Sequence, residues 1–251
     1  MGIFSNIFGK KPEPVEPVDY ALFKADMHSH LIPGIDDGAQ NLEESMELIK
    51  GLMAQGYTTL ITTPHVMSDF YRNSSETILA GLEVLRAEVA KENLDVTLYA
   101  AAEYYLDRDF SKKIKEEKLL SFGKENYVLF ELSYLNEPDS IHRTIFDLQV
   151  AGYKPILAHP ERYPFYYDKF KTYADIKEKG ALLQLNINSL TGYYSMPTKG
   201  IAERLIDEGL IDFVGTDCHK TGHVKLLEVA KTNAHFRKLV DSGKVLNDTL
   251  A

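Results

Sequence analysis

Nine side chains of the sequence have the residue types and spacing of metal ligands. Two histidines form a His-x-His pair near residue 30, and an Asp-x-His pair follows near residue 218. The nine residues are His28, His30, Asp37, His65, Glu103, Glu131, His159, Asp217 and His219. Side chains two positions apart in an extended strand point to the same side, so each pair can face one centre. Imidazole and carboxylate ligands of this kind suit manganese, iron, cobalt or zinc.

The number of these side chains favours a cluster of ions over one ion. A single histidine at a strand end is more often a structural residue than a ligand. Burying so many ionisable groups in one place without cations would cost several kcal/mol for each group. Zinc takes about four ligands and a carboxylate can bridge two ions, so the set predicts two or three divalent metal ions. Cys218 alternates to the opposite side from its neighbours Asp217 and His219 and is not a predicted ligand.

Seven short runs of β-branched, leucine or aromatic residues alternate with amphipathic segments. The predicted strands cover residues 22–30, 58–65, 97–105, 127–132, 155–159, 182–187 and 212–217. Helices are predicted after Asn41, which with Glu44 resembles a capping box, and from Ser75. Alternation with a repeat of about 30 residues is typical of βα units around parallel strands. The predicted fold class is therefore α/β, a single distorted (β/α)7 barrel whose strand ends bring the nine side chains to one face.

Composition excludes several classes of function. The chain of 251 residues has 28 Lys plus Arg against 37 Asp plus Glu, a net charge of −9. This excess of acidic residues argues against a protein that binds nucleic acids non-specifically or that binds anionic membranes. The single cysteine cannot form an intrachain disulfide, and no apolar run approaches the roughly 20 residues of a membrane span. We expect a cytoplasmic protein.

The first 20 residues differ in composition from the rest. A short apolar patch that includes Phe4 and Phe8 is followed by two lysines and a stretch rich in proline, glutamate and valine. We predict an N-terminal arm over residues 1–20 and one domain over residues 21–251. Phenylalanine and isoleucine beside lysine can rest at a lipid surface, so the arm allows at most a weak, peripheral association with the inner membrane.

The motifs that carry the nine residues resemble a known family. DMHSHLIPGIDDG, TPH, AAE, FEL, LAHPERY and TDCH follow one another over residues 24–220. This order resembles the polymerase and histidinol phosphatase (PHP) superfamily and, within it, the capsule-type bacterial manganese-dependent protein-tyrosine phosphatases. The resemblance implies manganese, with iron or zinc as alternatives. It also implies three ligand groups: His28, His30, Glu103 and Asp217; Glu103, Glu131 and His159; and Asp37, His65 and His219, with Glu103 shared by the first two.

A phosphomonoesterase is consistent with these residues. Water held between two metal ions is acidic enough to be a nucleophile near neutral pH. Arg162 can clamp a phosphate with its planar fork, the alternative being a surface pair with Glu161. Asp217 and His219 are candidates for handling the proton of the leaving group. Aromatic side chains expected in or beside loops of the same face can stack on a phosphotyrosine ring: Tyr104, Tyr105, Phe165, Tyr166, Tyr193 and Tyr194.

Two features test the resemblance. Thiol-dependent tyrosine phosphatases need an arginine six positions after the cysteine, and Val224 stands there after Cys218, so a cysteinyl-phosphate mechanism is unsupported. Members of the family often carry an arginine after the last Asp-x-His, whereas this chain has Lys220 and Lys225. Lysine supplies charge without the bidentate geometry of arginine.

The resemblance implies a substrate and leaves alternatives open. The implied partner is the phosphotyrosine-bearing tail of a bacterial tyrosine kinase that governs polysaccharide synthesis or export. One alternative is a phosphatase of small molecules such as histidinol phosphate or a sugar phosphate. An amidohydrolase is less favoured, because it usually has a bridging lysine and a single terminal aspartate. The third alternative is a non-enzymatic, metal-binding interaction module.

Overall fold

The computed structural model describes residues 15–116 and 118–251, so most of the predicted N-terminal arm lies outside the described residues. The strands are β1 (Ala25–Asp26), β2 (Thr59–Thr62), β3 (His65–Val66), β4 (Thr97–Ala100), β5 (Glu103–Tyr105), β6 (Tyr127–Glu131), β7 (Lys154–Ala158), β8 (Leu182–Asn186) and β9 (Phe213–Gly215). The α-helices are α1 (Leu42–Ala54), α2 (Ser75–Lys91), α3 (Arg108–Glu116), α4 (Ile141–Val150), α5 (Lys171–Glu178), α6 (Met196–Asp207), α7 (Thr221–Ala230) and α8 (Ala234–Asp241). Short 3-10 helices are η1 (Tyr20–Phe23), η2 (Pro160–Arg162), η3 (Pro164–Tyr166), η4 (Ile187–Thr191) and η5 (Asn247–Leu250).

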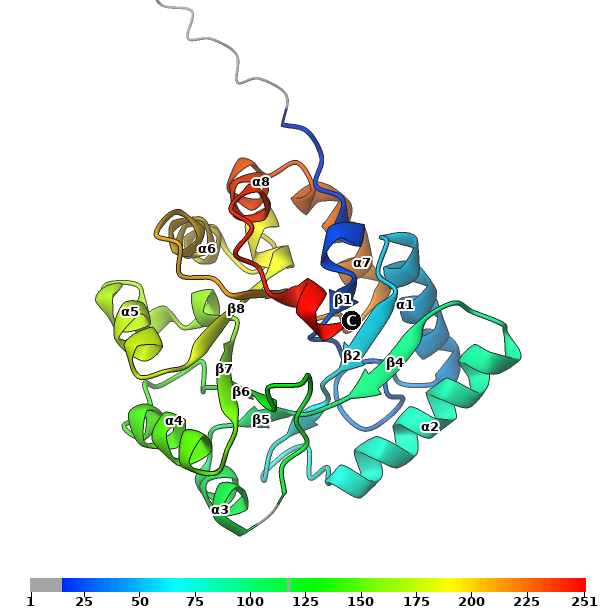
Figure 1. Ribbon diagram of the computed structural model, residues 1–251, viewed down its shortest axis with the longest axis horizontal. Helices are drawn as coiled ribbons and strands as arrows, with labels where there is room; N and C mark the ends of the chain where they lie inside the picture. The colour runs from blue at the N-terminus through cyan, green and yellow to red at the C-terminus, as the bar shows by residue number, and fades with distance from the viewer. Residues whose placement is uncertain (1–14, 117) are drawn as a thin grey trace, which may run out of the picture.

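The strands run in parallel and the α-helices surround them (Figure 1). They form a three-stranded sheet of order β1-β2-β4 and a six-stranded sheet of order β3-β5-β6-β7-β8-β9. The α/β class and the parallel pairing are as predicted. The described residues form two sheets rather than the one closed barrel sheet of the prediction.

Two of the predicted strands are each divided between the sheets. Residues 58–65 become β2 and β3, with Pro64 between them, and residues 97–105 become β4 and β5, with Ala101 and Ala102 between them. A proline has no backbone N–H for the ladder. The pairing continues across the interruption through single hydrogen bonds, from Ala101 N to Thr62 O (2.9 Å) and from Glu103 N to Pro64 O (3.1 Å).

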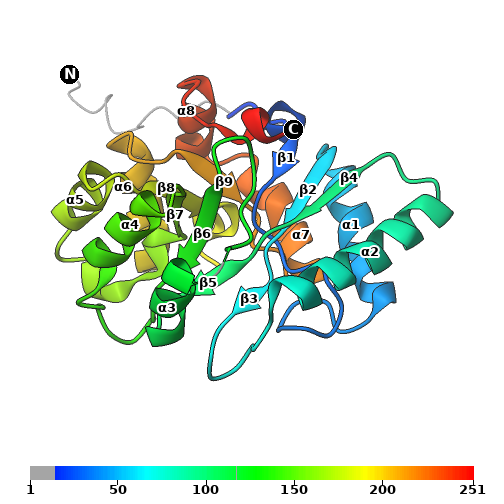
Figure 2. The ribbon, with the colours of Figure 1, turned by 60° about the horizontal axis from the view of Figure 1, so that its bottom comes forward.

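The first and last strand segments lie side by side without forming a ladder. Ser29 and Cys218 form an isolated parallel bridge, and His30 N donates to Cys218 O at 3.0 Å. At the other end, the buried Asn247 of η5 donates to Ala25 O (3.0 Å) and Val214 O (2.7 Å) and accepts from Val214 N (3.0 Å). The C-terminus therefore closes the end of the molecule opposite β3 and β5 (Figure 2).

The prediction for the first strand was wrong in its bounds. Residues 20–23 form η1, and the strand is limited to Ala25–Asp26 rather than residues 22–30. Asp19 caps η1 by accepting from Ala21 N at 3.0 Å, which favours a turn before the strand. Tyr20 is fully buried, and Val18 N donates to Lys231 O at 2.9 Å, so the end of the predicted arm packs against the body of the protein.

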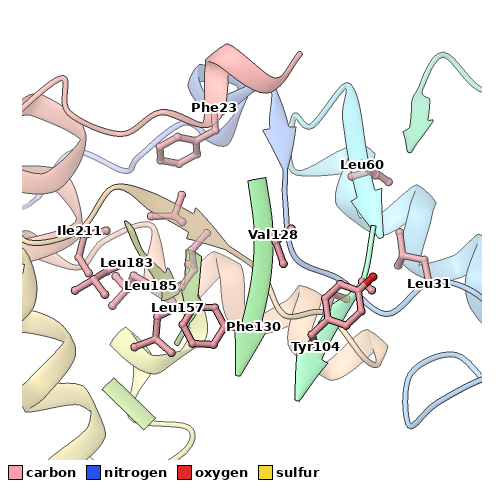
Figure 3. Packing of buried hydrophobic residues seen from close by; sticks show 14 of the residues in the cluster. Phe23, Leu31, Leu60, Tyr104, Val128, Phe130, Leu157, Leu183, Leu185 and Ile211 are labelled. Carbon is pink, nitrogen blue, oxygen red and sulfur yellow. The ribbon is translucent and has the colours of Figure 1, made fainter. Parts of the chain in front are cut away.

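The strands alternate between two apolar layers. Val128 and Phe130 of β6 and Leu157 of β7 belong to the large cluster that also receives the buried faces of the helices (Figure 3). Leu129 and Ile156 point the other way into a smaller cluster formed by strand residues and by the end of the chain. We call the side of the strands that carries this smaller cluster the inner face. Side chains alternate along a strand, so a residue two positions after Leu129 or Ile156 also points to the inner face.

The two helices predicted in detail are confirmed. Asn41 caps α1 by accepting from Glu44 N at 2.9 Å. The second helix starts at Ser75, as predicted, with Ser74 as its cap. Among the described residues, no helix is both long enough and apolar enough to cross a membrane.

Candidate metal centre

The structure brings all nine predicted ligands together in one place, within or after strands β1 to β9. Donor atoms within 4.8 Å of one another form four groups: His30, Asp37, His65 and His219; His28, His30 and Glu103; His28, His159 and Asp217; and His65, Glu103 and Glu131. On β5 and β6, alternation places Glu103 two residues after the inner-face Ala101, and Glu131 two residues after Leu129. The inner face is therefore apolar at one end and charged at the other.

The His-x-His and Asp-x-His pairs converge on one point. His28 Nε2 and His30 Nε2 lie 3.4 Å apart. Both face Glu103 Oε2, at 3.2 and 3.4 Å, and Asp217 Oδ1, at 3.4 and 3.5 Å. This is the first of the ligand groups that the resemblance implies.

The remaining ligands extend from this point in two directions. His159 Nε2 lies 2.9 Å from Glu103 Oε1, although the donor atoms of Glu103 and Glu131 group with His65 rather than with His159. His65 lies between the second and third groups: its Nδ1 is 3.1 Å from Glu131 Oε1 and its Nε2 is 3.4 Å from Asp37 Oδ1. His219 Nε2 is 3.3 Å from the same Asp37 oxygen. The nine side chains thus form one continuous cluster.

The histidines of the first pair are oriented by partners outside the predicted set. His30 Nδ1 lies 2.8 Å from Asp36 Oδ2, which also accepts from His65 N at 3.1 Å. His28 Nδ1 lies 2.9 Å from Gln184 Oε1. Holding one ring nitrogen fixes the tautomer and presents the other nitrogen to a metal, which is the usual arrangement around metal-ligating histidines. The sequence placed Asp36 in the correct loop without a role and did not indicate Gln184.

Two predicted ligands have left-handed backbones. φ is +33° at His159 and +48° at Asp217. This conformation is costly for residues other than glycine, and it concentrates at functional sites. Ala158 points to the inner face, so in a regular strand the side chain of His159 would point to the opposite face. The left-handed turn at His159 ends β7 and brings the imidazole of His159 to Glu103 instead.

Charges within the cluster oppose the effect of burial. Burial disfavours the carboxylate of Glu103, but His28 and His65 hold its pKa well below the usual value. The same competition, with His28 and His219, keeps the pKa of Asp217 well below its usual value. Burial and the charge of Arg162 lower the pKa of His159. A metal site needs ionised carboxylates and neutral imidazoles. Although burial opposes it, the nearby carboxylates raise the pKa of His28, His30 and His65, so a metal ion would displace protons from these rings.

The donor set fits divalent metal ions. Buried polar atoms without a hydrogen-bond partner in the structure include Glu103 Oε2, His65 Nδ1 and His159 Nδ1. Such atoms are costly unless something binds them, and a metal ion that binds there is one physical reason for them. Glu103 Oε2 is the strongest case because three imidazole nitrogens surround it within 3.4 Å.

Arg162 is held beside the cluster and is not paired with Glu161. Its Nη1 donates to Asp217 Oδ2 at 2.8 Å. Its guanidinium lies over the rings of Tyr134 and Tyr194, at 4.8 and 4.2 Å from their centres. Glu161 is fully buried and accepts instead from Asn186 N and Ser189 Oγ, while burial raises its pKa to about 7.

A cavity of about 620 Å³ opens over the cluster. Arg162, Lys220 and most of the predicted ligands line it. Of the predicted rings, Tyr105, Tyr193 and Tyr194 line the cavity, and Tyr71 and Tyr134 join them without having been predicted. Tyr104, Phe165 and Tyr166 do not line it; Tyr104 and Tyr166 are buried in the large apolar cluster.

The two lysines of the last loop differ in position. Lys220 reaches the cavity, with its Nζ 5.9 Å from the centre of the Tyr193 ring. Lys225 is exposed on α7 and is not among the residues that line the cavity. Of the two lysines, only Lys220 can therefore supply positive charge to the cavity.

Comparisons with known proteins identify the family of this chain. The family model described as "Capsular polysaccharide synthesis, CpsB/CapC" matches residues 24–244. Tyrosine-protein phosphatase YwqE of Bacillus subtilis is 30% identical over 194 residues, covering 77% of this chain and 76% of that protein. The putative tyrosine-protein phosphatase CapC of Staphylococcus aureus is 27% identical, covering 77% of this chain and 76% of its own.

Two solved structures are similar to this chain to different degrees. A structure from work on YwqE of Bacillus subtilis and CpsB of Streptococcus pneumoniae, described as unique metal-dependent tyrosine phosphatases, superimposes with a TM-score of 0.76. It is 26% identical and covers 90% of this chain and 95% of its own. The lactonase Lmo2620 of Listeria monocytogenes, 12% identical with a TM-score of 0.54 and 95% coverage of both chains, shows a likeness of fold alone. The family match extends over nearly all of the motifs first identified in the sequence, and the chain belongs to the CpsB/CapC family of capsular polysaccharide synthesis proteins.

Proposed function

We propose that this protein is a metal-dependent protein-tyrosine phosphatase of the PHP type. The single observation that carries the proposal is the convergence of nine candidate nitrogen and oxygen ligands in one cluster, which borders a cavity that Arg162 also lines. The relatives support it, because several are named tyrosine-protein phosphatases and the similar solved structure is described as metal-dependent. The small-molecule phosphatase and the non-enzymatic module are the less favoured alternatives.

The nine residues would hold two or three divalent transition-metal ions, with manganese the proposed metal. The first ion would use His28, His30, Glu103 and Asp217. When bound, such ions activate water for attack on phosphorus and neutralise charge on the phosphate. The second ion would use Glu103, Glu131 and His159, and the third would use Asp37, His65 and His219.

Arg162 would bind the phosphate. Asp217 and the two tyrosine rings hold its guanidinium at the edge of the cavity. An arginine fork held in this way loses less conformational entropy on binding and can make two parallel hydrogen bonds to a phosphate. Asp217 and His219 are proposed to handle the proton of the leaving phenolate, which needs little help because the pKa of a free tyrosine is about 10.

The proposed architecture remains a distorted (β/α)7 barrel. Seven strand segments succeed one another in sequence order, with hydrogen bonds across the interruptions and a bridge between the first segment and the last. In such a barrel the catalytic groups come from the carboxyl ends of several strands.

The proposed partner is a cytoplasmic, phosphotyrosine-bearing tail of a bacterial tyrosine kinase in capsular polysaccharide synthesis. The names of the relatives and of the family support this choice. The cavity is suited to an aryl phosphate, because Tyr71, Tyr105 and Tyr193 stand around its charged floor.

Steady-state kinetics on matched substrates test the proposal. With Mn²⁺ present, we expect kcat/KM for a phosphotyrosine tail peptide to exceed that for its phosphoserine version and for histidinol phosphate. Preference for histidinol phosphate would instead establish the small-molecule alternative. No turnover of any of the three by metal-loaded protein would favour the interaction module.

Replacing Cys218 tests the mechanism. Its thiol is buried, burial raises its pKa, and it does not line the cavity. We expect Cys218→Ser and Cys218→Ala to keep kcat/KM within about twofold of the parent enzyme, since a protonated, buried thiol is a poor nucleophile. Peptide hydrolysis and metal content are measured together. A folded, metal-loaded Cys218→Ser protein without activity would revive covalent catalysis.

A further inference from the structure

The strand β8 contributes no predicted ligand, yet two of its side chains touch the metal centre. Leu183 and Leu185 of this strand pack into the large apolar cluster. Gln184 and Asn186 point to the opposite side, and both are fully buried. At the register position of Gln184, the neighbouring strands carry hydrophobic residues on the inner face, Ala158 on β7 and Phe213 on β9. Two buried amides are costly there unless their hydrogen bonds serve a purpose.

The amide of Gln184 has only one orientation that its partners accept. Its Oε1 lies 3.3 Å from the backbone N–H of His159, which is a donor and must meet an oxygen. The same oxygen lies 2.9 Å from His28 Nδ1, so this ring nitrogen carries the proton and donates it. His28 Nε2 is then unprotonated when the imidazole is neutral, and it is the atom that faces Glu103 and Asp217. One oxygen atom thereby sets the tautomer of one ligand and anchors the backbone of another.

The amide of Asn186 is fixed in the same way. Its Oδ1 accepts from Asn188 N at 2.9 Å, so its Nδ2 is the group that lies 2.8 Å from Asp217 Oδ2. Arg162 donates to that same carboxylate oxygen. The other oxygen, Asp217 Oδ1, faces His28 and is thereby presented to the metal centre.

Gly215 on β9 leaves the space that this arrangement needs. A Cβ atom at Gly215 would lie 2.8 Å from Gln184 Nε2 and 2.7 Å from His28 Cβ. Both contacts are shorter than real Cβ atoms make, so any larger residue would displace the glutamine or the histidine. The neighbouring strand is therefore shaped around the contact between Gln184 and His28.

We propose that Gln184 and Asn186 are positioning residues that set the metal affinity of the centre by orienting His28, His159 and Asp217. The inference rests on the metal site of the proposed function. Loss of a hydrogen-bond partner behind a metal ligand typically weakens metal binding by about 10–100-fold.

The test is calorimetric titration of the full-length protein, stripped with EDTA, with Mn²⁺ alone at pH 8. Gln184→Met keeps the size of the side chain and removes the acceptor, and we expect affinity to fall about 10–100-fold. Gln184→Glu keeps the acceptor and should retain the parent affinity. The exposed Gln149→Met on α4 is the matched control and should bind like the parent.

Asn186→Asp separates positioning from capping. The aspartate keeps the oxygen that accepts from Asn188 N but removes the donor to Asp217. We expect Mn²⁺ affinity about 10–100-fold weaker. We also expect a lower unfolding temperature of the metal-free protein, because two carboxylates would then be buried side by side. A capping role alone would leave affinity at the parent value.

Parent-like Mn²⁺ affinity in both Gln184→Met and Asn186→Asp would overturn the inference. So would equal losses in Gln184→Met and Gln184→Glu. Parent protein that binds Mn²⁺ but hydrolyses no phosphomonoester would remove the proposed function and leave this inference standing, because its readout is affinity. Parent protein that binds no Mn²⁺ would overturn both.

Discussion

Glu103→Gln is expected to remove most of the bound metal and to lower kcat by about 10³-fold or more. Glu103 is fully buried, and its two oxygens lie within 3.4 Å of nitrogens of four histidines. Glutamine has the same size but no charge, so it cannot neutralise two cations or bridge them. Loss of several kcal/mol of metal-derived transition-state stabilisation corresponds to that factor.

The measurement pairs elemental analysis with hydrolysis of a phosphotyrosine peptide. Glu125→Gln is the control, because Glu125 is an exposed residue paired with Lys154 far from the cluster, and it should behave like the parent enzyme. Circular dichroism verifies that the Glu103→Gln protein is folded. A folded variant with parent metal content and parent kcat would show that Glu103 is not the central ligand.

Arg162→Ala is expected to lower kcat/KM by about 10²–10³-fold when Mn²⁺ is saturating. Losing a preorganised donor to the charge that develops in the transition state typically has an effect of this size. Arg162 and Asn186 donate to the same oxygen of Asp217, so Mn²⁺ affinity is expected to fall as well, and saturating Mn²⁺ keeps the metal content at the parent level. Arg162→Lys should recover only a small part of the activity, since an ammonium group lacks the bidentate fork.

The control for this prediction is Arg143→Ala on α4. Arg143 is an exposed arginine that pairs with Asp147 and does not line the cavity. Its replacement should leave kcat/KM within about twofold of the parent value, as is usual for an exposed ion pair. If Arg162→Ala also stayed within that range, Arg162 would be reassigned to holding Asp217 and the loop after β7.

The convergence of the predicted ligands could be expected from the sequence where strand geometry is regular. Side chains two positions apart in a strand share a face, so Glu103 follows Ala101, and Glu131 follows Leu129, on the inner face. Parallel strands then bring these ends together, whatever the details of the sheet. The two-sheet arrangement was not predictable from hydrophobic pattern, because residues 97–105 remain one extended run while their partners change at Ala101 and Ala102.

The supporting residues were missed for a different reason. Gln184 and Asn186 are uncharged amides in an ordinary strand, and nothing in their spacing distinguishes a buried partner of histidine from a residue that faces solvent. Tyr134 follows β6 in a loop, and its position over Arg162 depends on contacts between segments distant in sequence. Asp36 and Asp37 are adjacent acidic residues, and only the structure shows that Asp36 binds His30 while Asp37 reaches His65 and His219.

Metal content measured alongside activity tests the central claim most directly. Elemental analysis of the purified protein should find two or three transition-metal ions per chain, with manganese expected to support activity. Chelation should abolish hydrolysis of a phosphotyrosine peptide and lower the unfolding temperature, since a ligand that binds only the folded state stabilises it. Added Mn²⁺ should restore both. Full activity in the presence of chelator, with no stoichiometric metal in the protein, would contradict the account.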